Sequence, residues 1–176
     1  MAYAFQEARI LPKGYGVASV VSTNSVSRLE VRPGTTVRAF DPTLGGAKFI
    51  FLPTIASVTV GSLVRYIQSG SGVYTTSMVP NTAGLSQPVA VAMVAGAANN
   101  YAWFQIEGTA PVKKAAVKIN ANVALFISAT TGRVTAVVAS GKSVVGMRSS
   151  NSASVVSATS VVYCTFIEPH MQGAVI

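Results

Sequence analysis

Hydrophobic and polar positions along the chain follow the pattern of short strands separated by turns. Apolar runs are interrupted about every eight to twelve positions by Gly, Ser, Asn or Pro, which is the spacing of turns in sandwiches and barrels. Val and Thr are frequent within the runs, and β-branched side chains suit the pleated surface of a strand. Helix-favouring residues such as Leu, Glu, Lys and Gln are few. The pattern predicts an all-β fold, a compact β-barrel or β-sandwich.

This pattern occurs twice in the later part of the chain. Residues 57–73 and 116–134 each contain alternating positions, a Gly or Asn at a bend, an apolar strand, a Ser/Thr/Gly turn and a Val-led strand. The second halves of the two copies also correspond, with 87–94 and 101–108 resembling 142–147 and 155–167. We therefore expect two pseudo-repeats, about 55–110 and 111–168, of about four strands each. Side by side they would give a closed fold of about eight strands.

Two runs are apolar at nearly every position, residues 101–106 and 161–167. Continuous apolarity is typical of a strand covered on both faces, so both runs are predicted to be buried. The first run holds the single tryptophan, Trp103, which we expect to anchor the core. The second holds the single cysteine, Cys164, so the chain can form no internal disulfide, and we expect a buried, inert thiol.

The first segment, residues 1–48, differs from the domain that follows at 49–171. It is rich in Pro and Gly, and short strands are predicted at 16–21 and 35–40. The sequence Arg32-Pro33-Gly34-Thr35 predicts a turn, because Pro sets φ and Gly accepts the left-handed position. The segment is either an extended arm that grips a neighbour, which we prefer, or an irregular part of the domain.

The C-terminal tail, residues 172–176, ends in two apolar residues, Val175 and Ile176. Either these residues dock into a groove of a neighbouring subunit, or the tail folds onto its own domain. The residues expected to contact neighbours come from both ends of the chain. They are Tyr3, Phe5, Arg9, Lys13, Arg28, Arg32, Val175 and Ile176.

Composition narrows the kinds of partner. Charged residues are 10% of the chain, against about a quarter in ordinary soluble domains. A surface with few charges loses little ion hydration when it is covered, which favours a chain that packs against other proteins. The net charge is +8, but the basic residues are scattered and no aromatic residues alternate with them. An acidic protein surface is therefore a better expected partner than nucleic acid.

Candidate chemistry is sparse. One His and one Cys cannot fill a zinc site, and the chain has no phosphate-binding loop, dinucleotide fingerprint or nucleophile elbow. Glu107 and Glu168 occupy similar places after the two long runs and could approach each other, but a charge at a strand end is easily solvated. We expect no enzyme activity, no cofactor and no metal. Neither a signal peptide nor a membrane span is predicted.

Four stretches resemble head decoration, or cement, proteins of tailed bacteriophages. They are 89–94 (VAVAMV), 99–110 (NNYAWFQIEGTA), 122–134 (NVALFISATTGRV) and 143–148 (SVVGMR). The resemblance covers about residues 45–176. It implies a β-rich domain that binds the major capsid protein on the outer surface of the capsid, as homotrimers by preference or as dimers. It carries over no catalytic residue.

This resemblance implies synthesis in the cytoplasm of the bacterial host and a final place on the virion. Two alternatives remain open from the residues alone. The chain could be another virion component, such as a head fibre, neck or tail protein. It could also be a carbohydrate-binding or adhesion β domain.

Overall fold

The computed structural model describes residues 4–5, 20–22 and 31–174. Twelve strands and no helix are found among these residues, so the predicted all-β class is confirmed. The strands are β1 (Ala4–Phe5), β2 (Val20–Ser22), β3 (Thr36–Asp41), β4 (Gly45–Pro53), β5 (Leu63–Gln68), β6 (Tyr74–Met78), β7 (Val89–Ala92), β8 (Asn100–Lys113), β9 (Ala124–Ile127), β10 (Val134–Thr135), β11 (Ser143–Ser149) and β12 (Val161–Met171). Within the described ranges there is accordingly no helical segment that could cross a membrane.

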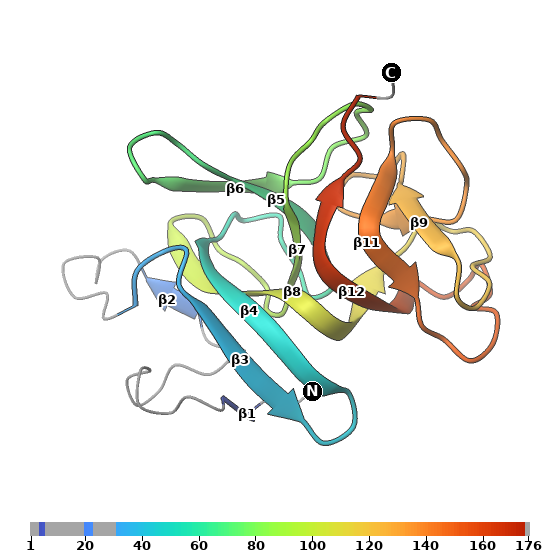
Figure 1. Ribbon diagram of the computed structural model, residues 1–176, viewed down its shortest axis with the longest axis horizontal. Coiled ribbons are helices and arrows are strands. Elements are labelled where there is room, and N and C mark those ends of the chain that lie inside the picture. Colours follow the sequence, from blue (N-terminus) through green and yellow to red (C-terminus); the bar gives the residue numbers. More distant parts are fainter. Residues whose placement is uncertain (1–3, 6–19, 23–30, 175–176) are drawn as a thin grey trace.

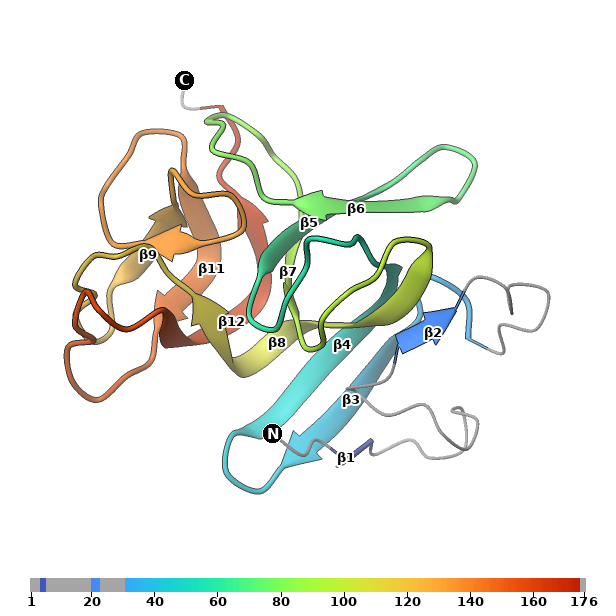
Figure 2. The same cartoon turned by 180° about the vertical axis from the view of Figure 1, so that it is seen from behind.

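The strands form one curled antiparallel sheet in the order β1-β3-β4-β8-β12-β11-β9-β10, from which the β5–β6 hairpin, β7 and β2 branch (Figures 1 and 2). Strand β8 is central because it pairs with β4 and β12 and also with β2 and β7. Its 14 residues are enough to take different partners along its length. The sheet curls about β8, so segments far apart in sequence lie close together.

The two pseudo-repeats have the same strand pairing. In the first, β5 pairs with β6 and β7, and β7 pairs with β8. In the second, β9 pairs with β10 and β11, and β11 pairs with β12. The two units join where β8 and β12, the last strand of each, run antiparallel over seven residue pairs.

Backbone conformation at the turns also corresponds between the units. Gly61 (φ +80°) and Asn122 (φ +54°) lie two residues before β5 and β9, and Gly72 (φ +80°) and Gly132 (φ +70°) lie two residues before β6 and β10. Positive φ is easy for Gly and tolerated by Asn. The Gly or Asn expected at the bend therefore marks a left-handed residue in each copy.

The core is built around the middle of β8. Residues 102–106 are all buried, which confirms that this run is covered on both faces. Trp103 has no exposed surface, and its ring lies 5.1 Å from that of Phe51 in β4. The predicted role of Trp103 as a core anchor is confirmed. Cys164 is also buried, and its burial raises the pKa of the thiol far above its usual range.

The prediction that 161–167 is covered on both faces is wrong. Burial alternates along β12, and Tyr163 and Ile167 are 45% and 68% exposed, whereas Val162, Cys164 and Phe166 are buried. Alternate side chains of a strand point to opposite faces, and only one face of β12 packs on the core. The run therefore places large apolar side chains in solvent.

The sheet includes part of the segment that was expected to be an arm. Strand β3 confirms the strand predicted at 35–40, and it pairs with β4, in which residue 48 lies. The boundary expected at residue 48 thus falls inside a strand. Strand β2 overlaps the end of the predicted strand at 16–21, whose earlier residues lie outside the described part.

The turn predicted at Arg32–Thr35 is confirmed. The Thr35 amide donates a hydrogen bond to the Arg32 carbonyl at 3.1 Å, and Gly34 has φ +89°. A Cβ at Gly34 would collide with the ring of Tyr74 from β6. Glycine is therefore needed here for the turn and also for the close approach of the β5–β6 hairpin.

Candidate functional site

One face of the central strands carries exposed and half-buried side chains, most of them uncharged. It is formed by Tyr163, Thr165 and Ile167 of β12, Glu107, Thr109 and Pro111 of β8 and Arg148 of β11, and we call it the outer strand face. Cross-strand pairing brings these residues together, because Tyr163 lies opposite Pro111 and Thr165 lies opposite both Thr109 and Arg148. Directly paired side chains share a face of the sheet.

The outer strand face carries a pair of neighbouring hydroxyl groups and a shallow hollow. The hydroxyls of Thr109 and Thr165 lie 3.1 Å apart. A shallow hollow of about 350 Å³ lies between β11 and β12 and is lined by Gly146, Met147, Arg148, Thr165, Phe166 and Ile167. Gly146 belongs to a bulge, where an added Cβ would stand 2.7 Å from the Ile167 carbonyl oxygen. Glycine at this bulge allows β11 to lie close to β12 beside Ile167.

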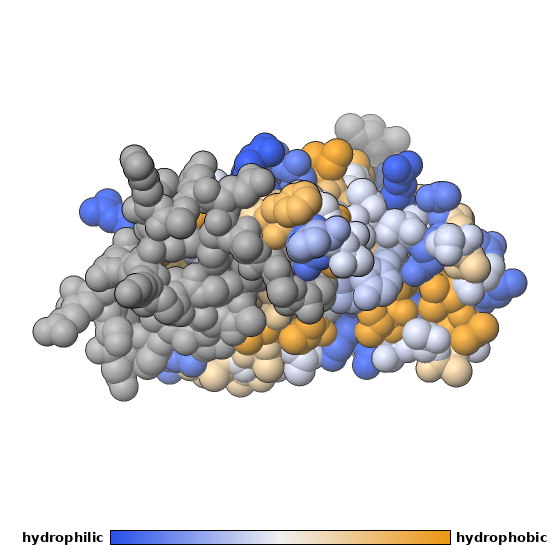
Figure 3. All heavy atoms as spheres, turned by 90° about the horizontal axis from the view of Figure 1, so that it is seen from below, coloured by the Kyte–Doolittle hydropathy of each residue, from blue (hydrophilic) through white to orange (hydrophobic). Residues whose placement is uncertain are grey.

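Exposed apolar residues also occur elsewhere on the surface. In Figure 3, apolar patches (orange) alternate with pale and with strongly hydrophilic (blue) residues over the part of this side that is not drawn in grey. Val137 and Val138, in the loop between β10 and β11, are 59% and 78% exposed. The outer strand face differs from this loop because its side chains are held in register by paired strands.

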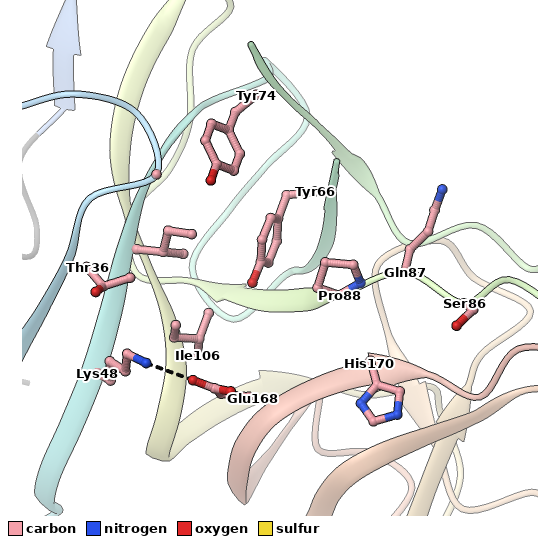
Figure 4. A pocket seen from close by; sticks show the side chains of 12 residues that line it. Thr36, Lys48, Tyr66, Tyr74, Ser86, Gln87, Pro88, Ile106, Glu168 and His170 are labelled. Atoms are coloured by element: carbon pink, nitrogen blue, oxygen red, sulfur yellow. Dashed lines mark hydrogen bonds and ion pairs between the residues drawn. The ribbon is translucent and has the colours of Figure 1, made fainter. Parts of the chain in front are cut away.

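A second candidate site is a cleft between the β5–β6 hairpin and the curled sheet (Figure 4). It has a volume of about 500 Å³, within the range of about 300–1,000 Å³ typical of ligand sites. Its lining comes from β3, β4 and the turn before β3, from β5, β6, β8 and the segment before β7, and from β12. The lining residues are Gly34, Thr36, Lys48, Ile50, Tyr66, Tyr74, Ser86, Gln87, Pro88, Ile106, Glu168 and His170.

An ion pair crosses one side of this cleft. Lys48 Nζ of β4 donates a hydrogen bond to Glu168 Oε1 of β12 at 2.7 Å, and the side chains are 25% and 62% exposed. The hydrogen bond from Lys48, followed by its positive charge, lowers the pKa of Glu168, so this carboxyl is ionised at neutral pH. Glu168 also has φ +41°, a left-handed conformation that is rare for a non-glycine residue.

Two tyrosines from the hairpin form the opposite side of the cleft. Tyr66 of β5 and Tyr74 of β6 are both half-buried. Burial, then the negative charge of Glu168, then Tyr74, raise the pKa of the Tyr66 phenol, so its O–H remains a donor. In Figure 4 the Tyr66 hydroxyl points toward Ile106, Lys48 and Glu168.

The orientation of Gln87 is fixed from outside the cleft. Arg65 Nη1 donates to Gln87 Oε1 at 2.8 Å, and Arg65 Nε donates to Ser77 Oγ at 2.7 Å. An arginine can only donate, so the amide oxygen faces Arg65 and the amide NH₂ remains a donor. The Gln87 carbonyl accepts from the Met171 amide at 2.9 Å, which ties this wall to β12.

Most of the residues expected to contact neighbours lie outside the described part. These are Tyr3, Arg9, Lys13, Arg28, Val175 and Ile176. Of the others, Phe5 lies opposite Ala39 near the end of β3, whereas Arg32 is exposed in the turn before β3. The structure thus places Arg32 before the start of β3 and Phe5 beside the second half of β3.

The two carboxylates considered as a pair have separate cationic partners. Glu107 lies 4.0 Å from Arg38, and Glu168 binds Lys48. Among the described residues, no three His, Cys, Asp or Glu side chains gather as a group that could hold a metal ion. Glu107 pairs with Ile167, the residue before Glu168, so the two glutamates stand one register position apart at the junction of β8 and β12.

Sequence reasoning missed the cleft. Lys48, Tyr66, Tyr74 and Glu168 are separated by up to 120 residues, and no local motif joins them. The sequence does contain one signal. After the apolar run of the second pseudo-repeat, Glu168 stands at the position where the first pseudo-repeat has Gly108. A charged residue at a position that needs a left-handed backbone is a reason to look for a site.

Comparison with protein-family models, with curated proteins and with solved structures gives no match for this chain. The functional argument therefore rests on the residues and the geometry described above.

Proposed function

We propose that this chain is a non-enzymatic capsid decoration protein of a tailed bacteriophage. In this proposal it binds the major capsid protein on the outside of the shell and stabilises the particle. The observation that carries the proposal is the outer strand face, where a regular sheet presents Tyr163 and Ile167 to solvent in a chain with few charges.

Physical chemistry favours protein contact as the use of this face. Covering apolar side chains stabilises a complex by about 25 cal/mol per Å² of apolar area removed from water. Thr109, Thr165 and Pro111 add little desolvation cost because they carry no charge. The charged members of the face are Arg148 and Glu107, which lies opposite Ile167 and 4.0 Å from Arg38, and arginine is common in protein interfaces. The face is thus cheap to desolvate and gains from being covered.

The net charge of +8 supports an acidic partner surface. Attachment to a shell also suits a small contact, because a homo-oligomer that binds several capsid subunits gains from avidity. We favour a homotrimer, with a dimer as the alternative. Stabilisation of the shell would follow from mass action, since a ligand that binds only the assembled state shifts the equilibrium toward that state.

Attachment to purified shells tests the proposal. Shells prepared without this protein would be mixed with it, separated by sedimentation and analysed by gel densitometry. Wild-type protein should bind at a fixed ratio to the capsid protein. Ile167→Asp should reduce binding at least tenfold, because a buried carboxylate without a partner is strongly unfavourable.

Val138→Asp is the matched control, because Val138 is at least as exposed as Ile167 but lies in a loop away from the outer strand face. It should bind like the wild type. Unfolding curves would show that both variants are folded. If wild-type protein does not bind the shell, or if Ile167→Asp binds like Val138→Asp, the proposal is wrong.

A further inference from the structure

We propose that the cleft between the β5–β6 hairpin and the sheet binds an uncharged or weakly charged oligosaccharide, with Tyr66, Glu168, Lys48 and Gln87 as the principal contacts. This inference concerns a surface distinct from the outer strand face and does not depend on attachment to a shell. It goes beyond the structural role proposed above, because it gives the chain a ligand of its own.

The tyrosines supply the apolar part of such a site. A sugar ring has a C–H face that packs on an aromatic ring and an edge of hydroxyls that need polar partners. Tyr66 and Tyr74 combine an aromatic body with a hydroxyl. Both also line a neighbouring hollow of about 470 Å³, which shares Ser86, Gln87 and Pro88 with the cleft. Two adjoining hollows with shared aromatic walls suit a ligand of more than one sugar unit.

Donors and acceptors stand together on the other side. Lys48 Nζ has three hydrogens and the Glu168 carboxylate has about four acceptor sites, so the single bond between them leaves both groups with capacity for a ligand. Adjacent sugar hydroxyls can donate to the carboxylate and accept from the ammonium. At the other end of the cleft, beside Pro88, Gln87 adds an amide donor whose orientation Arg65 fixes (Figure 4). The site therefore offers both kinds of hydrogen-bonding group.

The conformation of Glu168 is a separate observation that points to a site. A left-handed backbone is unfavourable for a non-glycine residue, and such residues cluster where a side chain must be held for function. At Glu168 this backbone directs a carboxylate into the cleft beside Lys48 (Figure 4). A glycine would relieve the backbone cost but would leave the cleft without its acidic group.

Charge and strand pairing argue against other ligands. Lys48 and Glu168 balance each other, so the cleft lacks the excess positive charge that a nucleic acid or an acidic peptide would need. An extended peptide would bind by adding to an open strand edge. Strands β4, β5, β8 and β12 are each hydrogen-bonded on both sides, so they present side chains to the cleft, whereas β6, which carries Tyr74, pairs only with β5 among the described strands.

The same residues limit what the cleft does with a saccharide. Glycoside hydrolysis usually needs two carboxyl groups flanking the bond. Glu168 is the single acidic residue among those that line the described cleft. We therefore infer binding without cleavage.

An array of immobilised bacterial and plant oligosaccharides, probed with the purified full-length chain, tests the inference. At least one oligosaccharide should bind and should not be cleaved. Isothermal titration with the strongest binder should show affinity reduced at least tenfold in Glu168→Gln and in Tyr66→Ala. Amide shift changes in the wild type on adding that oligosaccharide should centre on Tyr66, Gln87 and Glu168, which locates the site without any variant.

Matched controls are Glu107→Gln, which removes a carboxylate outside the cleft, and Phe40→Ala, which removes a 47% exposed ring from β3. Both should bind like the wild type. The inference is overturned if no oligosaccharide binds, if shift changes map away from the cleft, or if Glu168→Gln retains wild-type affinity. Binding of an acidic peptide to the cleft in place of every saccharide would also overturn it. Shell attachment is measured separately, so either proposal can fail alone.

Discussion

Glu107 of β8 and Ile167 of β12 are direct partners where the two pseudo-repeats meet, and each is followed by a left-handed residue. These residues are Gly108, with φ +103°, and Glu168, with φ +41°. Strands β8 and β12 therefore each contain a left-handed residue directly after the Glu107–Ile167 pair. At Gly108 a Cβ would stand 2.6 Å from the Gly46 carbonyl oxygen, so that copy requires glycine. In the other copy the position holds the glutamate of the cleft.

Replacing Gly108 by alanine should destabilise the fold. The backbone conformation alone costs about 1–3 kcal/mol for a non-glycine residue, and the contact with Gly46 adds to this cost. Chemical denaturation would measure the change. Gly46→Ala is the control, because no atom lies within 4 Å of a Cβ added there, and it should change stability by less than about 0.5 kcal/mol. Equal effects of the two substitutions would contradict the role given to Gly108.

The Lys48–Glu168 bond predicts a pH dependence. The pKa of Glu168 is lower in the folded than in the unfolded state, so its contribution to stability is complete above the unfolded pKa. That contribution is lost as the pH falls through the lowered pKa of the folded state. The difference in unfolding free energy between wild type and Glu168→Gln should therefore be present at pH 7 and shrink toward pH 3. A difference that grows toward acid pH would contradict the ion pair.

The two adjacent lysines provide a second matched comparison. Lys114 is fully buried, and its Nζ donates to the carbonyls of Ala115, Val117 and Ser157 at 3.1, 2.7 and 3.4 Å. Lys114→Met would leave these oxygens without their donor, at a cost of about 2 kcal/mol or more. Lys113→Met removes a more exposed side chain and should cost less than about 1 kcal/mol.

Denaturant titration of both lysine variants checks this prediction. Burial also lowers the pKa of the Lys114 amino group. Between the folded and unfolded pKa values the unfolded state binds more protons, so wild-type stability should rise with pH there relative to Lys114→Met. A Lys114→Met variant as stable as Lys113→Met would show that these carbonyl contacts do not stabilise the fold.

Cys164 should be unreactive while the protein is folded. The thiolate is the reactive form, and burial raises the pKa of this thiol and closes access to it. A chromogenic disulfide reagent at pH 8 should label the native chain at least a hundredfold more slowly than the denatured chain. Native labelling at the denatured rate would mean that the region of β12 around Cys164 opens readily.

Much of the fold could be predicted because its signals are local. The turn at Arg32–Thr35, the burial of Trp103 and the two related units follow from Pro and Gly placement, apolar runs and repetition along the chain. Strand pairing is not local in this sense. Nothing in the sequence around Lys48 indicates that it lies beside Glu168, because this depends on the register of β4, β8 and β12.

The apolar run in β12 shows a different limit. Residues 161–167 are apolar at nearly every position, as is the buried run in β8, yet Tyr163 and Ile167 are exposed. An apolar run indicates that its side chains are more stable when another surface packs on them. It does not indicate whether that surface belongs to the same chain or to a second protein. In β8 the cover is the chain's own β4, β7 and neighbouring core. For β12 we propose a second protein.

A cryo-electron microscopy reconstruction of the intact phage particle tests that proposal most directly. The account predicts density for an all-β body on the outside of the shell, at symmetry-related positions, with Tyr163 and Ile167 of the outer strand face against the major capsid protein. A shell without this density, or density in which Tyr163 and Ile167 face solvent, would contradict it.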